Sequence, residues 1–199
     1  MKRSIVLLLF ALIVPVIVVA CDSDGDEAVE LPDSLTIETS FGYSATAFLP
    51  RDWPGQAIQG GDQFIICNHA TCAPDFVGGN QILGNLVVFA EETLPEGIEA
   101  DDSVSDVLDF IVNISIGDSE TAELGDVETF ELNDKAGASI YFVQRDGDAA
   151  IEFRVIVVRE EAINGFSILS MSGAEDEVAQ FEGFLRAIVT SVALTPLSE

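Results

Sequence analysis

Most of the chain is divided into short apolar runs separated by turn residues, which is typical of strands. Eight runs are expected to form strands: 35–40, 43–50, 63–67, 85–92, 121–131, 137–144, 149–159 and 165–171. A turn at Gly42 separates the first two runs. The pairs Asp146-Gly147 and Asn164-Gly165 stand between the last three, and such pairs favour hairpin turns whose two central residues have positive φ. The last three runs are therefore predicted to be consecutive antiparallel strands.

Two segments change to the helical period. The first is capped by Ser103 and Asp106, and its apolar residues recur at helical spacing. The second lies within 172–192 and begins with the capping-box spacing of Ser172 and Glu175. Its apolar stripe consists of Val178, Phe181, Leu185, Ile188 and Val192. Each helix is expected to pack this single apolar face on a sheet.

The first 20 residues have the pattern of an export signal. Lys2 and Arg3 precede an apolar run over 5–19, and Ala20 stands before Cys21. The segment resembles the lipobox of bacterial lipoproteins, in which the cysteine thiol is acylated and the preceding peptide is removed. This resemblance implies that Cys21 carries lipid and holds the protein on the extracytoplasmic side of the cell membrane. An uncleaved anchor helix and a soluble secreted product are the alternatives, and the short apolar run argues against the anchor.

The rest of the chain divides into a short tether and one folded unit. Residues 1–20 are interpreted as the signal peptide and 21–33 as an acidic flexible linker, because this stretch is rich in carboxylates and poor in aromatic residues. Residues 34–195 suit a single domain with a substantial core.

The charge of the chain excludes one class of partner. Removing residues 1–20 leaves six basic and 35 acidic residues, a formal charge of −29. Such a surface repels phosphate backbones and anionic lipid, so nucleic acid is not an expected partner. Divalent cations remain an alternative, since Asp22, Asp24 and Asp26 have the spacing of a calcium loop. Position twelve of that loop is Asp33 instead of glutamate, and no metal ligand is assigned.

The densest group of reactive side chains is "CNHATC", which holds Cys67, His69 and Cys72. Outside the cytoplasm two cysteines so close in sequence are expected to form a disulfide, which would stabilise the fold by about 2 kcal/mol. A zinc site with Asp75 as fourth ligand and free thiols are the alternatives. His69, the only histidine, is a candidate binding residue at the tip of the loop.

Nothing in the sequence indicates catalysis or a bound cofactor. A hydrolytic triad needs a base beside a nucleophile, and the single histidine has no nucleophile-elbow motif near it. No glycine-rich loop of the kind that holds phosphates is present either.

The segment "FGYSATAFLPRDW" at 41–53 has a glycine-tyrosine pair leading through a strand to Pro50 and Trp53. The C-terminal part adds a long hairpin and a closing helix that contains Phe181 and Phe184. Together these features resemble the PsbP-like superfamily, which includes an extrinsic subunit of photosystem II, exported bacterial proteins and a relative that binds the GTPase Ran. The resemblance implies an α+β fold, a single-domain sandwich with a central antiparallel sheet of about six strands and helices on its faces.

The resemblance also implies a binding or assembly module instead of an enzyme. The expected function is docking to an unidentified envelope protein, and the alternative is a receptor for a small ligand or a divalent metal. Trp53 is interpreted as an aromatic residue that covers the sheet, with ligand stacking as the alternative.

Overall fold

The computed structural model describes residues 29–58, 61–68, 82–117, 121–146, 149–174 and 176–198, together with the backbone of 17–19. The strands are β1 (Ile17–Val19), β2 (Val29–Leu31), β3 (Asp33–Glu38), β4 (Tyr43–Leu49), β5 (Gly55–Ile58), β6 (Gln63–Cys67), β7 (Leu83–Phe89), β8 (Ala122–Leu124), β9 (Glu128–Leu132), β10 (Lys135–Asp146), β11 (Ala149–Glu160), β12 (Gly165–Ala174) and β13 (Ala193–Pro196). The helices are α1 (Val104–Ile116) and α2 (Glu182–Thr190), and the 3₁₀ turns are η1 (Glu91–Thr93), η2 (Glu161–Ile163) and η3 (Ala179–Phe181).

The strands form one large sheet and two small ones. The large sheet has the order β5-β6-β7-β12-β11-β10-β8, and β9 also pairs with β10. All of its strand pairs are antiparallel. A three-stranded sheet has the order β13-β4-β3, and β1 pairs with β2.

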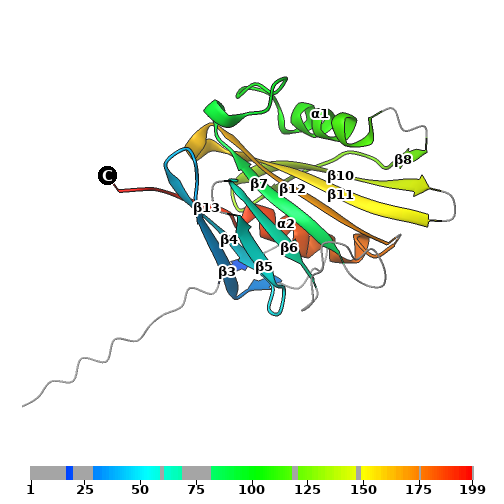
Figure 1. Cartoon of the computed structure of the whole chain (residues 1–199), viewed down its shortest axis with the longest axis horizontal. Coiled ribbons are helices and arrows are strands. Elements are labelled where there is room, and N and C mark those ends of the chain that lie inside the picture. Colours follow the sequence, from blue (N-terminus) through cyan, green and yellow to red (C-terminus); the bar gives the residue numbers. More distant parts are fainter. Residues whose placement is uncertain are drawn as a thin grey trace, which may run out of the picture.

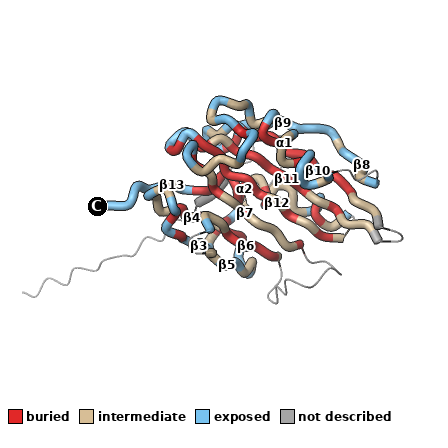
Figure 2. Tube along the Cα trace, turned by 45° about the horizontal axis from the view of Figure 1, so that its top comes forward, coloured by how far each residue is buried: buried red, intermediate tan, exposed pale blue. Residues whose placement is uncertain are grey.

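Helices cover both faces of the large sheet (Figure 1). Helix α1 packs on β10 and β11 from one side, and α2 packs on β11 and β12 from the other, where it also contacts β2 and β4. The alternation of side chains along β11 separates two cores: Val155 and Val157 face α1, whereas Ile156 and Val158 face α2. Figure 2 shows buried residues concentrated along the central strands.

The structure confirms the expected α+β architecture and corrects the size of its sheet. The large sheet has eight strands, not about six. One reason is that the run predicted as a single strand over 121–131 is divided into β8 and β9. Leu124 is opposite Phe142, but Glu128 is opposite Ser139, so one extra residue is inserted between the two pairings. An insertion of this kind is a β-bulge, which bends an edge strand. Strand β5 was not predicted.

Helix α1 has the predicted start. Ser103 Oγ accepts a hydrogen bond from Asp106 N at 3.2 Å, and the Asp106 carboxylate accepts one from Ser103 N at 3.3 Å. This reciprocal pair satisfies two of the backbone donors at the helix end. Among the described residues, no helix combines the length and the apolar character that crossing a bilayer requires.

The prediction for the second helix was wrong about where it begins. Ser172 lies in β12, opposite Leu83 of β7 and Phe153 of β11, and α2 starts only at Glu182. Pairing on both sides of β12 extends the strand through the expected capping position. Val178 is nevertheless buried, in the segment that connects β12 to α2.

The structure confirms one of the two predicted hairpin turns and differs from the prediction at the other. The β10–β11 hairpin is confirmed, with Asp146 opposite Ala149, and residues 147–148 lie outside the described part. At the other turn Asn164 has φ of 47°, but Gly165 does not have positive φ. A Cβ atom on Gly165 would lie 1.9 Å from the carbonyl oxygen of Phe89, so close contact with β7 is what requires glycine.

The folded part begins before the predicted boundary at residue 34. Val29–Leu31 form β2, and Leu31 is fully buried in the core beside α2. The end of the predicted linker is therefore part of the domain, while residues 21–28 lie outside the described part.

Candidate functional site

The structure brings two of the predicted site residues to the same end of the domain. Cys67 ends β6 and is buried, and its backbone N–H donates to the carbonyl of Pro54 at 3.1 Å. Trp53 immediately precedes Pro54. Cys21, His69 and Cys72 lie outside the described residues, so lipidation, the disulfide and the role of His69 stay predictions.

Trp53 belongs to a cluster of three aromatic rings. Its ring meets Phe181 edge to face at a centroid distance of 5.5 Å, and it lies 5.9 Å from the ring of Phe184. Trp53 and Phe181 are partly buried against the core, whereas Phe184 is 36% exposed. The cluster therefore covers the start of α2 and leaves apolar surface open to the outside. We call these three residues the aromatic end.

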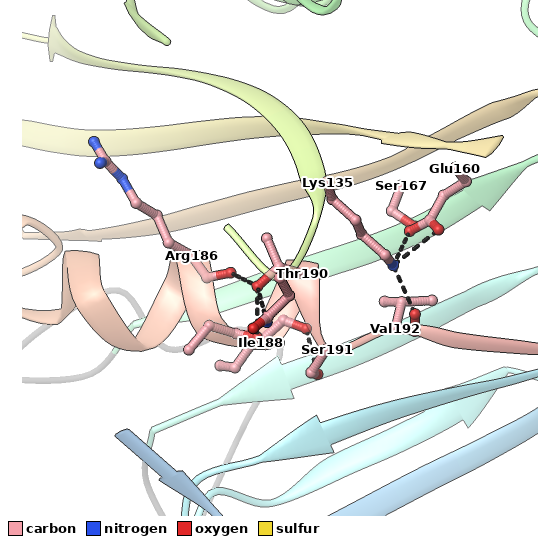
Figure 3. Close-up of polar contacts among 10 residues, drawn as sticks. Lys135, Glu160, Ser167, Arg186, Ile188, Thr190, Ser191 and Val192 are labelled. Carbon is pink, nitrogen blue, oxygen red and sulfur yellow. Dashed lines mark hydrogen bonds and ion pairs between the residues drawn. The ribbon is translucent and has the colours of Figure 1, made fainter. Parts of the chain in front are cut away.

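A second candidate is a pocket of about 300 Å³ beside Lys135 and Glu160. Lys135 Nζ donates to both Glu160 oxygens at 2.9 Å and to the carbonyl of Val192 at 2.7 Å. The Ser167 hydroxyl donates to Glu160 Oε1 at 2.7 Å. Figure 3 shows these contacts converging from β10, β11, β12 and the residues after α2.

The Lys135–Glu160 pair beside this pocket is held by contacts within the fold. An ammonium group has three donors, and all three of those on Lys135 are used inside the protein. Burial raises the pKa of Glu160, and the nearby Lys135 and Ser167 act against that rise. The pair thus joins three strands and the end of α2, and its charges are not available to a ligand.

A second buried network connects α2 to the sheet edge. Arg154 is buried in β11 and donates to Ser139 Oγ at 3.0 Å, to Glu128 Oε2 at 3.4 Å and to Glu182. Arg186 of α2 also pairs with Glu128 and Glu182. Although partial burial acts to raise the pKa of Glu128, the two guanidinium groups hold it below its ordinary value.

A smaller pocket of about 260 Å³ is acidic. It is lined by Glu123, Glu152 and Asp176, with Tyr141 beside them. Glu152 is buried, and its Oε2 accepts from Val178 N at 3.1 Å. Burial raises the pKa of Glu152, the backbone N–H groups after β12 oppose this rise, and the Asp176 charge adds to it. Glu152 thus holds the segment that leads into α2.

Sequence reasoning missed these buried charges. Glu152, Arg154 and Glu160 occupy alternate positions of β11 that face α2, among apolar neighbours. A charged residue at an inward position of a strand is the signal that could have revealed them, because such residues are seldom buried without a partner.

Nearly all the basic side chains after residue 20 form ion pairs with carboxylates of the same domain. Five of the six basic residues after residue 20 are in ion pairs: Lys135 with Glu160, Arg145 with Glu123, Arg154 with Glu182, Arg159 with Glu161, and Arg186 with Glu128. The exposed surface is therefore dominated by carboxylates. Within the part of the chain that the structure describes, no group of three or more histidine, cysteine or acidic side chains is arranged to hold a metal ion.

Comparisons with known proteins address the fold. No model of a protein family matches the chain, and no curated protein matches it. The cyanobacterial PsbP of Synechocystis sp. PCC 6803 superposes with a TM-score of 0.51 at 14% identity, covering 88% of this chain and 97% of that one. The chain has a PsbP-like fold.

Two structures of Mog1 have a similar fold. The Ran-binding protein Mog1p of Saccharomyces cerevisiae has a TM-score of 0.50 and 12% identity, over 81% of this chain and 95% of that one. A variant of Mog1 has a TM-score of 0.52 and 10% identity, over 82% and 97%. At such identities the likeness establishes the fold alone, and it agrees with the superfamily that the sequence resembles.

Proposed function

We propose that this protein is an exported, lipid-anchored, non-catalytic module that docks to another protein of the cell envelope. The fold is compatible with this role, since the similar yeast protein is a Ran-binding protein. The lipid would be attached at Cys21, which the lipobox-like segment predicts.

The distribution of charge is the observation that carries the proposal. The segment over 91–109 holds eight acidic residues and no basic one. All but Asp102 of these eight are exposed, on the side of the large sheet that α1 covers (Figure 1). We call this segment the acidic face. It suits a partner with a basic surface, because complementary potentials accelerate encounter and fix orientation.

The buried polar groups favour binding over catalysis. Ser167 and Glu160 are at a nucleophile–base distance, but Ser167 is fully buried and out of reach of a substrate. Lys135 and Glu160 of the larger pocket are paired with each other within the domain, which also argues against the alternative of a small-ligand receptor.

Affinity capture with the lipidated full chain tests the docking function. Membranes are solubilised, and proteins retained by the wild type are compared with those retained by two variants of equal charge. The acidic-face variant carries Glu92→Gln, Glu96→Gln and Asp109→Asn. The control variant carries Glu30→Gln, Glu38→Gln and Glu131→Gln, which are exposed elsewhere.

We expect a reproducible partner that the acidic-face variant loses and the control keeps, with retention that falls as salt rises. Recovery of no reproducible partner would contradict the docking function. Equal retention by both variants would show that the acidic face is not the contact.

The anchor has a separate test. Cys21→Ser should abolish incorporation of labelled fatty acid into the protein. Incorporation that persists in this variant would place the lipid elsewhere. A thermal scan of the wild type with calcium, zinc and a metabolite panel examines the receptor alternative. A ligand at 100 times its dissociation constant would add about 2.7 kcal/mol of apparent stability.

A further inference from the structure

We infer that the aromatic end of the domain rests on the lipid surface, with Trp53 and Phe184 at the level of the headgroups. This inference rests on the proposed lipid at Cys21. It concerns a different property, namely which face of the domain contacts the bilayer.

The length of chain between the lipid and the domain limits the orientation. Val29, the first residue of β2, is eight residues after Cys21. Eight residues span at most about 29 Å when fully extended. A compact domain of this size has a radius of gyration of about 15 Å and hence a diameter of about 40 Å. The tether is therefore too short for the side farthest from Val29 to face the membrane.

The chain at this point of entry lies near the aromatic end, because Asp33, two residues after β2, is opposite Leu49, four residues before Trp53. Val29, Trp53 and Phe181 all pack at the periphery of the same core, and α2 contacts β2. Helix α1 covers the opposite face of the large sheet (Figure 1). A domain held close to the membrane through Val29 therefore turns its aromatic residues toward the lipid and the acidic face away from it.

The chemistry of this end suits an interface between water and hydrocarbon. Tryptophan is favoured at headgroup level because its ring is amphipathic. Arg51, two residues before Trp53, is exposed and can approach lipid phosphates. Burial of the exposed part of Phe184 in the bilayer would add a favourable hydrophobic contribution to the free energy of membrane binding. The acidic residues of the linker oppose anionic lipid, so the surface that fits best is a zwitterionic one.

The chain contains a probe for this contact, since Trp53 is its only tryptophan. Lipidated protein is reconstituted into phosphatidylcholine vesicles that carry a nitroxide either near the headgroup end of the acyl chain or at its methyl end. Vesicle flotation measures anchoring, and quenching of Trp53 emission measures contact. We expect strong quenching by the shallow label and weak quenching by the deep one, since interfacial elements reach a depth of about 5–10 Å.

Two matched variants test whether the membrane contact is specific to the aromatic end. Phe184→Asp should reduce the quenching while the protein still floats with the vesicles. Ile114→Asp changes another exposed apolar residue, which is 60% exposed on α1 at the opposite face, and should leave quenching as in the wild type. If Phe184→Asp fails to fold, the comparison of shallow and deep labels in the wild type remains decisive.

Flotation without quenching by the shallow label would overturn the inference and leave the lipid anchor intact. Loss of flotation in the wild type would remove the anchor, and the inference with it. Equal loss of quenching in both variants would also overturn it, because the contact would then not be specific to the aromatic end.

Discussion

Lys135 Nζ lies 2.9 Å from each carboxylate oxygen of Glu160, and this ion pair links the first residue of β10 to the last residue of β11. The two positions are opposite each other in the continued register of the hairpin. Glu160 is 3% exposed, so its charge depends on the lysine for compensation. Lys135 is the only lysine after the predicted signal peptide, and the fold uses it for packing α2 against the sheet.

Replacement of Lys135 by methionine should lower the free energy of unfolding by about 3–5 kcal/mol, because it leaves the Glu160 carboxyl buried without its partner. The double variant Lys135→Met with Glu160→Leu should recover much of this loss, since apolar residues of similar volume often replace a buried pair without cost. Denaturant unfolding measures both. A single variant as stable as the wild type would show that the pair contributes little.

Stability should depend on pH through buried carboxyls. The pKa values of Glu152 and Glu160 are raised above the ordinary value of 4.5 in the folded protein. The folded state therefore binds a proton on each of these carboxyls more tightly than the unfolded state does. The stability that the two groups add is fully present below pH 4.5 and is lost as the pH rises through their raised pKa values. Glu128 acts in the opposite direction, because its lowered pKa adds stability that is lost on acidification.

The variant Glu152→Gln isolates one of these contributions. Its side chain is neutral at every pH, so the fall in unfolding free energy above pH 4.5 should be smaller than in the wild type. Glu30→Gln, at an exposed position, is the matched control with the same change of charge. Chemical unfolding at a series of pH values gives the slopes, and identical slopes for Glu152→Gln and the wild type would contradict the role of burial.

Two arginines on the large sheet should differ in their effect on stability. Arg154 has a side chain only 4% exposed, and Arg154→Ala should cost about 1.5–3 kcal/mol because it removes charge-assisted hydrogen bonds to Ser139 and two glutamates, although Arg186 keeps the glutamates paired. Arg145 is 40% exposed and pairs with Glu123 at the surface. Arg145→Ala should cost less than about 1 kcal/mol. Comparable losses of unfolding free energy in the two variants would be inconsistent with this ranking.

The predicted Cys67–Cys72 disulfide can be tested by mass measurement of non-reduced peptides from the exported protein. A linked peptide is expected, and its reduction should lower the unfolding free energy by about 2 kcal/mol, since the loop it closes is short. Two free thiols in that peptide would rule the disulfide out.

Local patterns anticipated much of the secondary structure. The capping pair of Ser103 and Asp106 determines the start of α1 because both partners are close in sequence. Strand β6 has the expected limits for a similar reason, since a short apolar run ends at a loop. By contrast, the capping spacing of Ser172 and Glu175 did not predict a helix start, because Ser172 lies in β12, which pairs with strands on both sides.

The sequence by itself determined the period of most elements, the antiparallel hairpin of β10 and β11 and the excess of carboxylates. These follow from interactions between residues near in the chain or from composition alone. Only the tertiary structure decided that Trp53 meets Phe181 and Phe184, and that Lys135 meets Glu160. Such pairs depend on the register of strands and the placement of α2, which bring together side chains that no local spacing connects.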